Sequence, residues 1–385
     1  MQTAKWQHLQ RYIQRTFSMP GAFRQPVNRA IGLYTLLRLP EVVYYQPEQV
    51  KIETTTRCNL ACRFCGHTWG AARGLGLEHL PEDDEANKSL LNICRRAGRH
   101  MDLASFQRII EQFPNMTRLD IQGMGEPLMN PDFPSFLELG VERNIQVQFF
   151  TNATLLTRSL AQKIVQANVS EVSISLDGVT AQSYEMVRQG AQFEKVVENI
   201  RNFCEIRRQA GSRKPIIRLA LVVTSFNVGE LPQLVELAHN LGADQVVATQ
   251  FKCISQNLAS WVCERGALAA AVGSARRKSL ELSVPFKIEF ALDPPPSQAA
   301  SPASAPASLR RAKNTCFWPW FSINIDINGN LTPCAYVPCN EGWELGNLLE
   351  RPFKEIWNAD SYKHLRRKLK MGNMQDIFCA FCIDK

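Results

Sequence analysis

Strand-like and helix-like segments alternate along the chain from residue 49 to about residue 250. The strand-like segments are residues 50–54, 118–122, 146–151, 171–176, 216–223 and 245–249. The helix-like segments between them are residues 102–113, 133–143, 155–167, 193–209 and 230–241. Several strands are almost continuously apolar, residues 216–223 above all, which is typical of parallel strands covered by helices. The pattern predicts an α/β fold, a partial (β/α)6 barrel of the TIM type.

Composition places the chain among ordinary globular proteins. It has 385 residues, of which 45% are hydrophobic and 21% are charged. No apolar run approaches the roughly eighteen residues of a membrane span, and no signal peptide opens the chain. We therefore expect no membrane span and a cytoplasmic protein. Twelve cysteines in such a chain indicate metal-binding or catalytic thiols rather than disulfides.

The net charge of +8 is concentrated in two places, residues 1–46 and residues 363–370. Such runs either bind an anionic partner or form solvated helix faces. No aromatic-rich nucleic-acid motif accompanies them, so we expect no nucleic-acid partner.

Cys58, Cys62 and Cys65 form a tight loop directly after the first predicted strand. In barrels of this class, chemistry is located at the carboxyl ends of the strands. Three thiolates can hold three corners of an iron–sulfur cluster, which normally takes four cysteines. One iron would then be open for another ligand. The alternatives at this point are a zinc loop and three thiols that are close by chance.

A glycine-rich turn, Gly123-Met124-Gly125-Glu126-Pro127, follows the second predicted strand. Its glycines allow the backbone to approach a ligand closely, and its free backbone groups can receive an ammonium or a carboxylate. Alone it is only a turn. Its position predicts that it shares the face of the barrel that carries the cysteine loop.

Together these motifs resemble those of the radical S-adenosylmethionine (SAM) enzymes. The three cysteines match that family's C-x3-C-x2-C motif, with the aromatic Phe64 before the last cysteine. The glycine-rich turn is similar to the family's GGEP motif. Two further segments, residues 175–178 and residues 184–188, are similar to its SAM-contacting segments. The resemblance covers residues 48–250.

The resemblance implies a role for each matching residue. Cys58, Cys62 and Cys65 would bind a [4Fe–4S] cluster whose open iron chelates the amino and carboxylate groups of SAM. One-electron reduction would cleave SAM to methionine and a 5′-deoxyadenosyl radical, which abstracts hydrogen from the substrate. The residues implied to contact SAM are Gly123, Gly125, Glu126 and Pro127 at the methionyl amine, Phe64 at the adenine, Ser175 and Asp177 at the ribose or methionine, and Arg188 at the carboxylate.

One matching segment departs from the family pattern. Residues 150–153 resemble the family's TNG segment, but Ala153 replaces the glycine and leaves a contact by Asn152 open. No residue is indicated as a proton donor or acceptor.

The C-terminal tail has a second cysteine pattern. Its thiols are Cys316, Cys334, Cys379 and Cys382, which can close a structural metal site, with zinc as one alternative. Beside the upstream motifs, the tail resembles the SPASM/twitch extension of radical SAM enzymes, which implies one auxiliary [4Fe–4S] cluster on these four cysteines. Only three residues follow the last of them, which indicates a shortened, twitch-like version. Cys339 is a further thiol that either replaces one of the four or stays free.

These segments predict a domain order along the chain. Residues 1–47 form a helical extension and residues 48–290 the core barrel. Within the core, the polar insert 66–101 is either a lid over the site or disordered. Residues 291–313 are a linker rich in proline, alanine and serine. Residues 314–385 form the auxiliary-cluster domain.

The resemblance implies an enzyme that abstracts hydrogen from a substrate carbon. The peptide-recognition module common among relatives with such tails is not visible in residues 3–39, which have a helical pattern. We therefore expect oxidation or epimerisation of a sugar-like or other small polar metabolite. Maturation of a ribosomal peptide or a protein side chain is the alternative, and a non-catalytic iron–sulfur or zinc protein is a third. A flavodoxin or ferredoxin is the expected electron donor.

Overall fold

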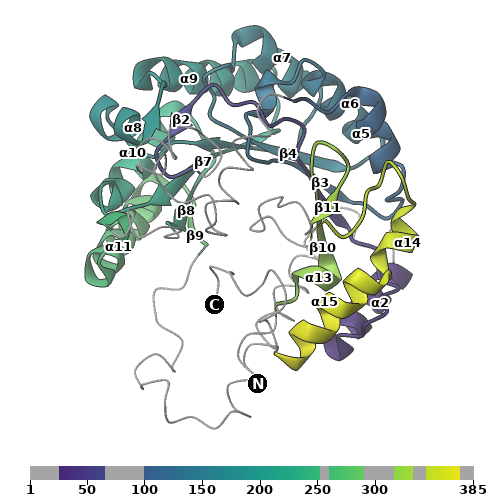
Figure 1. Ribbon diagram of the computed structural model, residues 1–385. Coiled ribbons are helices and arrows are strands. Elements are labelled where there is room, and N and C mark those ends of the chain that lie inside the picture. The colour runs from purple at the N-terminus through teal and green to yellow at the C-terminus, as the bar shows by residue number, and fades with distance from the viewer. Residues whose placement is uncertain (1–25, 66–98, 252–259, 290–315, 333–343, 373–385) are drawn as a thin grey trace, which may run out of the picture. The chain divides into compact units, whose positions relative to one another are not determined.

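The computed structural model describes residues 26–65, 99–251, 260–289, 316–332 and 344–372 (Figure 1). The chain divides into two compact units. The central unit comprises Glu53–Leu103 and Asp120–Pro294, and the terminal unit comprises Met1–Ile52, Ala104–Leu119 and Pro295–Lys385. Among the described residues, no helix is long and apolar enough to cross a membrane.

The central unit is built on parallel strands that neighbour one another in the order β4-β5-β7-β8-β9. Their bounds are β4 (Gln146–Thr151), β5 (Glu171–Ser175), β7 (Ile216–Val223), β8 (Gln245–Gln250) and β9 (Phe286–Ile288). β4 and β7 have the bounds that the sequence predicts. The predicted α/β class with mainly parallel strands is confirmed here.

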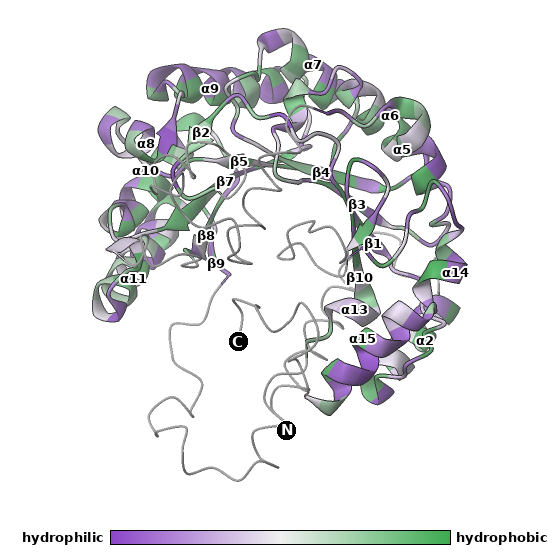
Figure 2. Cartoon of the chain, viewed as in Figure 1, coloured by the Kyte–Doolittle hydropathy of each residue, from purple (hydrophilic) through white to green (hydrophobic). Residues whose placement is uncertain are grey.

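Helices lie along one side of these strands (Figure 1). They are α6 (Phe133–Glu142), α7 (Arg158–Gln166), α8 (Ala181–Val187), α9 (Phe193–Gln209), α10 (Leu231–Leu241) and α11 (Arg265–Leu282). The strands are largely hydrophobic, whereas the helices carry both hydrophobic and hydrophilic residues (Figure 2). Alternate β7 side chains are buried, from Ile217 to Val223. The core of this unit therefore lies between the strands and the apolar faces of their helices.

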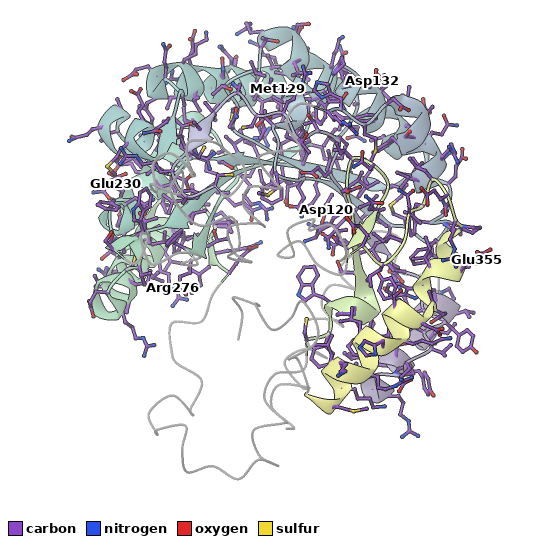
Figure 3. All side chains as sticks on the ribbon, viewed as in Figure 1. Asp120, Met129, Asp132, Glu230, Arg276 and Glu355 are labelled. Atoms are coloured by element: carbon purple, nitrogen blue, oxygen red, sulfur yellow. The ribbon has the colours of Figure 1, made fainter. Side chains whose placement is uncertain are left out.

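Short elements complete the central unit. A two-stranded antiparallel ladder joins β2 (Ala61–Cys62) to β6 (Arg188–Gln189). The 3₁₀ helix η2 (Pro127–Met129) precedes Asp132, which lies directly before α6, and η3 (Val228–Glu230) precedes α10; Figure 3 labels Met129, Asp132 and Glu230. β3 (Arg118–Ile121) runs from the terminal unit into the central unit along the chain.

The terminal unit joins the first predicted strand to the tail. β1 (Gln49–Ile52) pairs in parallel with β10 (Ser322–Ile325), in a register that sets Ile52 opposite Ile325. β10 returns through a turn at Gly329 to the antiparallel strand β11 (Leu331–Thr332). The helices of this unit are α2 (Pro26–Arg38), α5 (Leu103–Ile110), α13 (Trp318–Phe321), α14 (Phe353–Trp357) and α15 (Asp360–Met371).

Asn358 separates α14 from α15. Its side chain accepts a hydrogen bond from Val43 N (2.8 Å) and donates one to Val43 O (3.0 Å). These bonds fix the chain between α14 and α15 to the segment after α2.

Three predicted segments lie mostly or wholly outside the described residues. They are residues 1–25 of the helical extension, residues 66–98 of the insert, and the linker 291–313. The predicted domain boundaries stay a prediction.

Candidate active site

The cysteine loop is held by the short ladder between β2 and β6. Cys62 lies in β2, directly opposite Arg188 in β6. Arg63 N donates to Val187 O (3.0 Å), and Cys65 N donates to Cys62 O (3.1 Å). Cys62 is buried, and Cys58 and Cys65 are half-buried.

Burial makes the thiols of Cys58 and Cys62 poor acids in the absence of a metal. It raises the pKa of Cys58 to about 11, and it raises the pKa of Cys62 against the opposing effect of Arg188. Because cysteines bind metals as thiolates, metal binding by these thiols would release protons. Among the described residues, no three His, Cys, Asp or Glu side chains are grouped so that they could hold a metal ion.

Gly125 lets the glycine-rich turn pass directly over the start of the cysteine loop. A Cβ atom there would lie 2.6 Å from Arg57 O and would also overlap Thr55 O. Glu126 N donates to Arg57 O (2.7 Å). The close approach that the sequence predicts for this glycine is therefore made by the protein's own backbone.

Gly123 makes a similar close approach to Glu53, a residue that the sequence analysis did not single out. A Cβ atom on Gly123 would lie 2.5 Å from Glu53 Oε1. The same oxygen accepts a hydrogen bond from Met124 N (2.6 Å). A single acidic residue after a strand belongs to no sequence motif, so only the structure identifies this contact.

Glu126 connects the turn to the end of β4. Its carboxylate accepts hydrogen bonds from Thr151 Oγ1 (2.7 Å), Asn152 N (2.7 Å) and Leu128 N (3.2 Å). Burial raises the pKa of Glu126, and these bonds oppose the rise. Pro127 is buried at the start of η2. The carboxylate thus bonds within the protein, and its predicted contact with the SAM amine stays a prediction.

Asn152 joins the cysteine loop to the same strand end. Its Nδ2 donates to Asn59 Oδ1 (3.0 Å), and Asn59 Nδ2 donates to Thr154 Oγ1 (2.7 Å). Ala153, which stands where the family has glycine, has φ +58° in the left-handed region. The local backbone therefore has the conformation that favours a glycine, although the side chain here is a methyl group.

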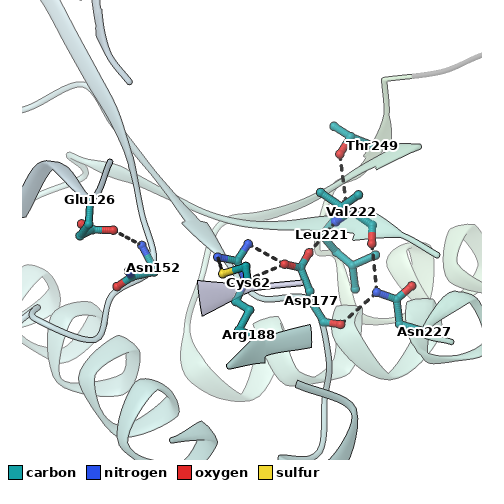
Figure 4. Close-up of polar contacts among 9 residues, drawn as sticks. All are labelled: Cys62, Glu126, Asn152, Asp177, Arg188, Leu221, Val222, Asn227 and Thr249. Atoms are coloured by element: carbon teal, nitrogen blue, oxygen red, sulfur yellow. Dashed lines mark hydrogen bonds and ion pairs between the residues drawn. The ribbon is translucent and has the colours of Figure 1, made fainter. Parts of the chain in front are cut away.

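Asp177 and Arg188 form a buried ion pair (Figure 4). The Asp177 Oδ2 atom accepts from Arg188 Nε (2.6 Å) and lies 2.5 Å from Nη2. Asp177 Oδ1 accepts from Val222 N (2.7 Å), and its carbonyl oxygen accepts from Asn227 Nδ2 (2.9 Å). Burial acts to lower the pKa of Arg188, but the Asp177 carboxylate outweighs it, so the pKa is raised. Ser175, at the end of β5, is half-buried.

Phe64 belongs to an aromatic group that the sequence analysis did not find. Its ring centroid lies 6.1 Å from that of Phe251 and 6.2 Å from that of Trp261. Phe226, after β7, packs on Trp261 at 5.1 Å. Phe251 follows β8, so this group gathers at the carboxyl ends of adjacent strands. No spacing in the sequence connects these residues.

The predicted auxiliary ligands are largely outside the described residues. Cys316 is described, half-buried and two residues before α13. Cys334, Cys379 and Cys382 are not described, nor is Cys339. The predicted four-cysteine set stays a prediction.

Two protein families match the chain. Residues 52–240 match the family described as the radical SAM superfamily, and residues 316–383 match SPASM, described as an iron–sulfur cluster-binding domain. The first match contains the cysteine loop, the glycine-rich turn and Arg188. The second begins at Cys316.

Curated relatives match over different lengths. A tungsten-containing aldehyde ferredoxin oxidoreductase cofactor-modifying protein of Pyrococcus furiosus is 29% identical over 51% of this chain, which is 50% of its own length. An AdoMet-dependent heme synthase of Methanosarcina barkeri is 25% identical over 83% of this chain and 85% of the relative. A PqqA peptide cyclase of Xanthomonas campestris is 22% identical over 81% and 73%. The chain thus spans about half the length of the first of these relatives.

Among solved structures, the chain is similar to Streptococcus suis SuiB, determined with its precursor peptide SuiA. The TM-score is 0.61 at 16% identity, covering 90% of this chain and 72% of that one. This likeness concerns the fold, and it confirms the predicted fold class.

Proposed function

Because this chain belongs to the radical SAM superfamily and carries a C-terminal SPASM domain, we propose that it is a radical enzyme that modifies a peptide or protein substrate. The observation that carries the proposal is the match to PqqA peptide cyclase, which extends over 81% of the chain. The helical pattern of residues 3–39, with no visible recognition module, favoured a small polar metabolite. Most of that segment, residues 1–25, lies outside the described chain. The match to a heme synthase keeps a small-molecule substrate as the second candidate.

The family's cofactors are a [4Fe–4S] cluster that binds SAM and auxiliary iron–sulfur clusters in the SPASM domain. When bound and reduced, the first cluster supplies the electron that cleaves SAM and starts radical chemistry. We assign Cys58, Cys62 and Cys65 as its ligands, since they lie on one loop that is fixed on both sides. After Cys58 the loop is held by the β2–β6 ladder. Before Cys58 it is held by the hydrogen bond from Glu126 N to Arg57 O. Because the three thiols are not grouped around a metal position in the structure, these two attachments would limit how far the thiols move when the cluster binds.

The remaining residues at this end of the strands would shape the space for SAM. The group of Phe64, Phe251 and Trp261 offers an apolar surface on which a planar adenine can stack. Glu126 and Asn152 hold the glycine-rich turn against the cysteine loop and so keep its backbone groups in place for the methionyl end. We infer that Ser175, at the end of β5, lies near the ribose or methionine.

We infer that Cys316, Cys334, Cys379 and Cys382 ligate an auxiliary cluster. Electrons for the first cluster would come from a one-electron carrier such as a flavodoxin or a ferredoxin.

The substrate class is tested with candidate peptides and small molecules side by side. Reconstituted, reduced protein is incubated with SAM and either short peptides encoded beside its gene or a panel of sugars and cyclitols, each deuterated at carbon. A peptide should transfer deuterium into 5′-deoxyadenosine and itself change mass. Transfer from a sugar or cyclitol, with none from any peptide, would overturn the peptide proposal and leave the radical chemistry intact.

A further inference from the structure

The side chain of Arg188 lies against the sulfur of Cys62 (Figure 4). The register of the β2–β6 ladder sets the two residues directly opposite each other. Side chains of such a pair lie close together on one face of the ladder. Arg188 Nη1 donates to Cys62 Sγ over 3.9 Å, within the range for a hydrogen bond to sulfur. Arg188 therefore contacts one of the three proposed cluster ligands directly.

Asp177 fixes the orientation of this guanidinium. It binds Nε at 2.6 Å and Nη2 at 2.5 Å, so Nη1 is the nitrogen that points to the sulfur. A guanidinium is planar and rigid, so two fixed nitrogens determine the position of the third. Asp177 is fully buried and is itself held by Val222 N at 2.7 Å. The position of Nη1 is thus set by the segment after β5 and by its hydrogen bond from β7.

We propose that Arg188, held by Asp177, is a positioning residue for Cys62 that raises the reduction potential of the cluster. The inference rests on the proposed function, because it requires Cys62 to be a cluster ligand. Hydrogen bonds to ligand sulfurs are among the factors that set cluster potentials. One-electron reduction adds negative charge to the cluster and its sulfurs. An N–H donor at Cys62 Sγ therefore stabilises the reduced form more than the oxidised form. The electron comes from a low-potential one-electron donor, and Arg188 keeps its proton.

The direct test compares Arg188→Lys with the wild-type full-length protein, reconstituted anaerobically and titrated without SAM. Lysine keeps the positive charge but has no planar fork to bind Asp177 and the sulfur together. Dithionite supplies the electrons, and the cluster is followed by the electron paramagnetic resonance (EPR) signal that is missing from Cys58→Ala. At the wild-type midpoint potential, the reduced-to-oxidised ratio should fall about tenfold in the variant, which is about 59 mV for one electron.

The matched control is Arg207→Lys in the same unit. Arg207 pairs with Asp244, and its guanidinium also donates to Pro215 O (2.8 Å) and Gly242 O (3.1 Å). This variant weakens a partly buried ion pair away from the cysteine loop and should leave the ratio unchanged. An equal shift in both variants, or no shift in Arg188→Lys at full iron content, would overturn the proposal.

A second measurement does not depend on a variant of Arg188. Wild-type protein is labelled with ¹⁵N in its arginine guanidinium groups, and the reduced cluster is studied by pulsed EPR. We expect a ¹⁵N coupling that persists in Arg57→Lys and Arg63→Lys. Its absence would overturn the contact, even if Arg188→Lys failed to take up iron.

The two proposals fail in different ways. If Cys62→Ala retained wild-type iron and the same EPR signal, the proposed cluster site itself would be wrong. If Cys62→Ala lost that signal while Arg188→Lys kept the wild-type potential, only the role of Arg188 would be refuted.

Discussion

At the scale of single residues, the site depends on close backbone packing. Gly125 lies where two backbone segments pass close to each other. A Cβ atom in place of its hydrogen would overlap Arg57 O. Gly178, after β5, is similarly confined, because a Cβ atom there would lie 2.5 Å from Tyr184 N and 2.6 Å from Ser183 Oγ. These glycines fix how the loops at the strand ends fit together.

Gly125→Ala should therefore destabilise the central unit and reduce its iron content. Overpacking of this kind costs about 1–3 kcal/mol, and here the overlapping atoms are backbone oxygens, which have little room to shift. The measurement is the urea midpoint together with iron per chain after reconstitution. Gly229→Ala is the control, because nothing lies within 4 Å of its Cβ position. Equal stability in the two variants would show that the turn does not need Gly125.

The thiol of Cys58 should be slow to alkylate in protein from which iron has been removed. Burial raises its pKa to about 11, so little thiolate exists at pH 8, and the reactive fraction grows as the pH rises toward 11. Mass spectrometry after iodoacetamide treatment at pH 8, 9 and 10 measures this. We expect the rate to rise about tenfold per pH unit over this range. A rate that levels off near pH 8.5 would contradict the raised pKa.

At the scale of helices and strands, the terminal unit is organised around a buried arginine on α15. Arg366 donates to the carbonyl oxygens of Pro319 (3.0 Å), Glu41 (3.0 Å) and Trp357 (2.8 Å). Its guanidinium lies 4.3 Å from the centroid of the Trp357 ring. Burial lowers the pKa of Arg366 to about 10. One side chain thereby connects α15 to α13, to α14 and to the segment after α2.

Arg366→Ala should strongly destabilise this unit. It removes the donors to three carbonyl oxygens, and a buried acceptor left without a partner costs about 1–3 kcal/mol. The comparison is Arg367→Ala, the next residue on α15, whose exposed pair with Glu41 should contribute little. Unfolding in urea, followed by tryptophan fluorescence, distinguishes them. Similar midpoints for both variants would refute the role given to Arg366.

Regular elements could be predicted from the sequence to a large extent, because their signal is periodic. The strand-like segment of β4, the apolar run of β7 and the amphipathic pattern of α9 gave the bounds that the structure has. The two-residue ladder between β2 and β6 was not predicted, because two residues have no period. The contact between Cys62 and Arg188 depends on that ladder and was missed for the same reason. Residues such as Glu53 and Trp261 join the site only through folding.

At the scale of the whole molecule, two family matches cover separate parts of the chain, residues 52–240 and residues 316–383. The structure adds that β1, which precedes the cysteine loop, pairs with β10 of the tail. The tail therefore places a strand beside the first strand of the predicted core. One link between the two regions is therefore made by backbone hydrogen bonds within the terminal unit.

Iron content tests the proposed division of cysteines between two clusters. Reconstituted wild-type protein should bind about eight irons per chain, four in each cluster. Cys316→Ala combined with Cys334→Ala should bind about four and retain the EPR signal of the SAM cluster. Eight irons in that double variant would remove these cysteines from the ligand set. About four in the wild type, unchanged by the double substitution, would exclude an auxiliary cluster.

The most direct test of radical SAM chemistry at the cysteine loop is the formation of 5′-deoxyadenosine. Reconstituted protein is reduced with dithionite, incubated with SAM and assayed by mass spectrometry. Wild-type protein should form 5′-deoxyadenosine, Cys204→Ala should match it, and Cys62→Ala should form none. The central claim is contradicted if fully loaded wild-type protein forms no 5′-deoxyadenosine, or if Cys62→Ala forms as much as the wild type.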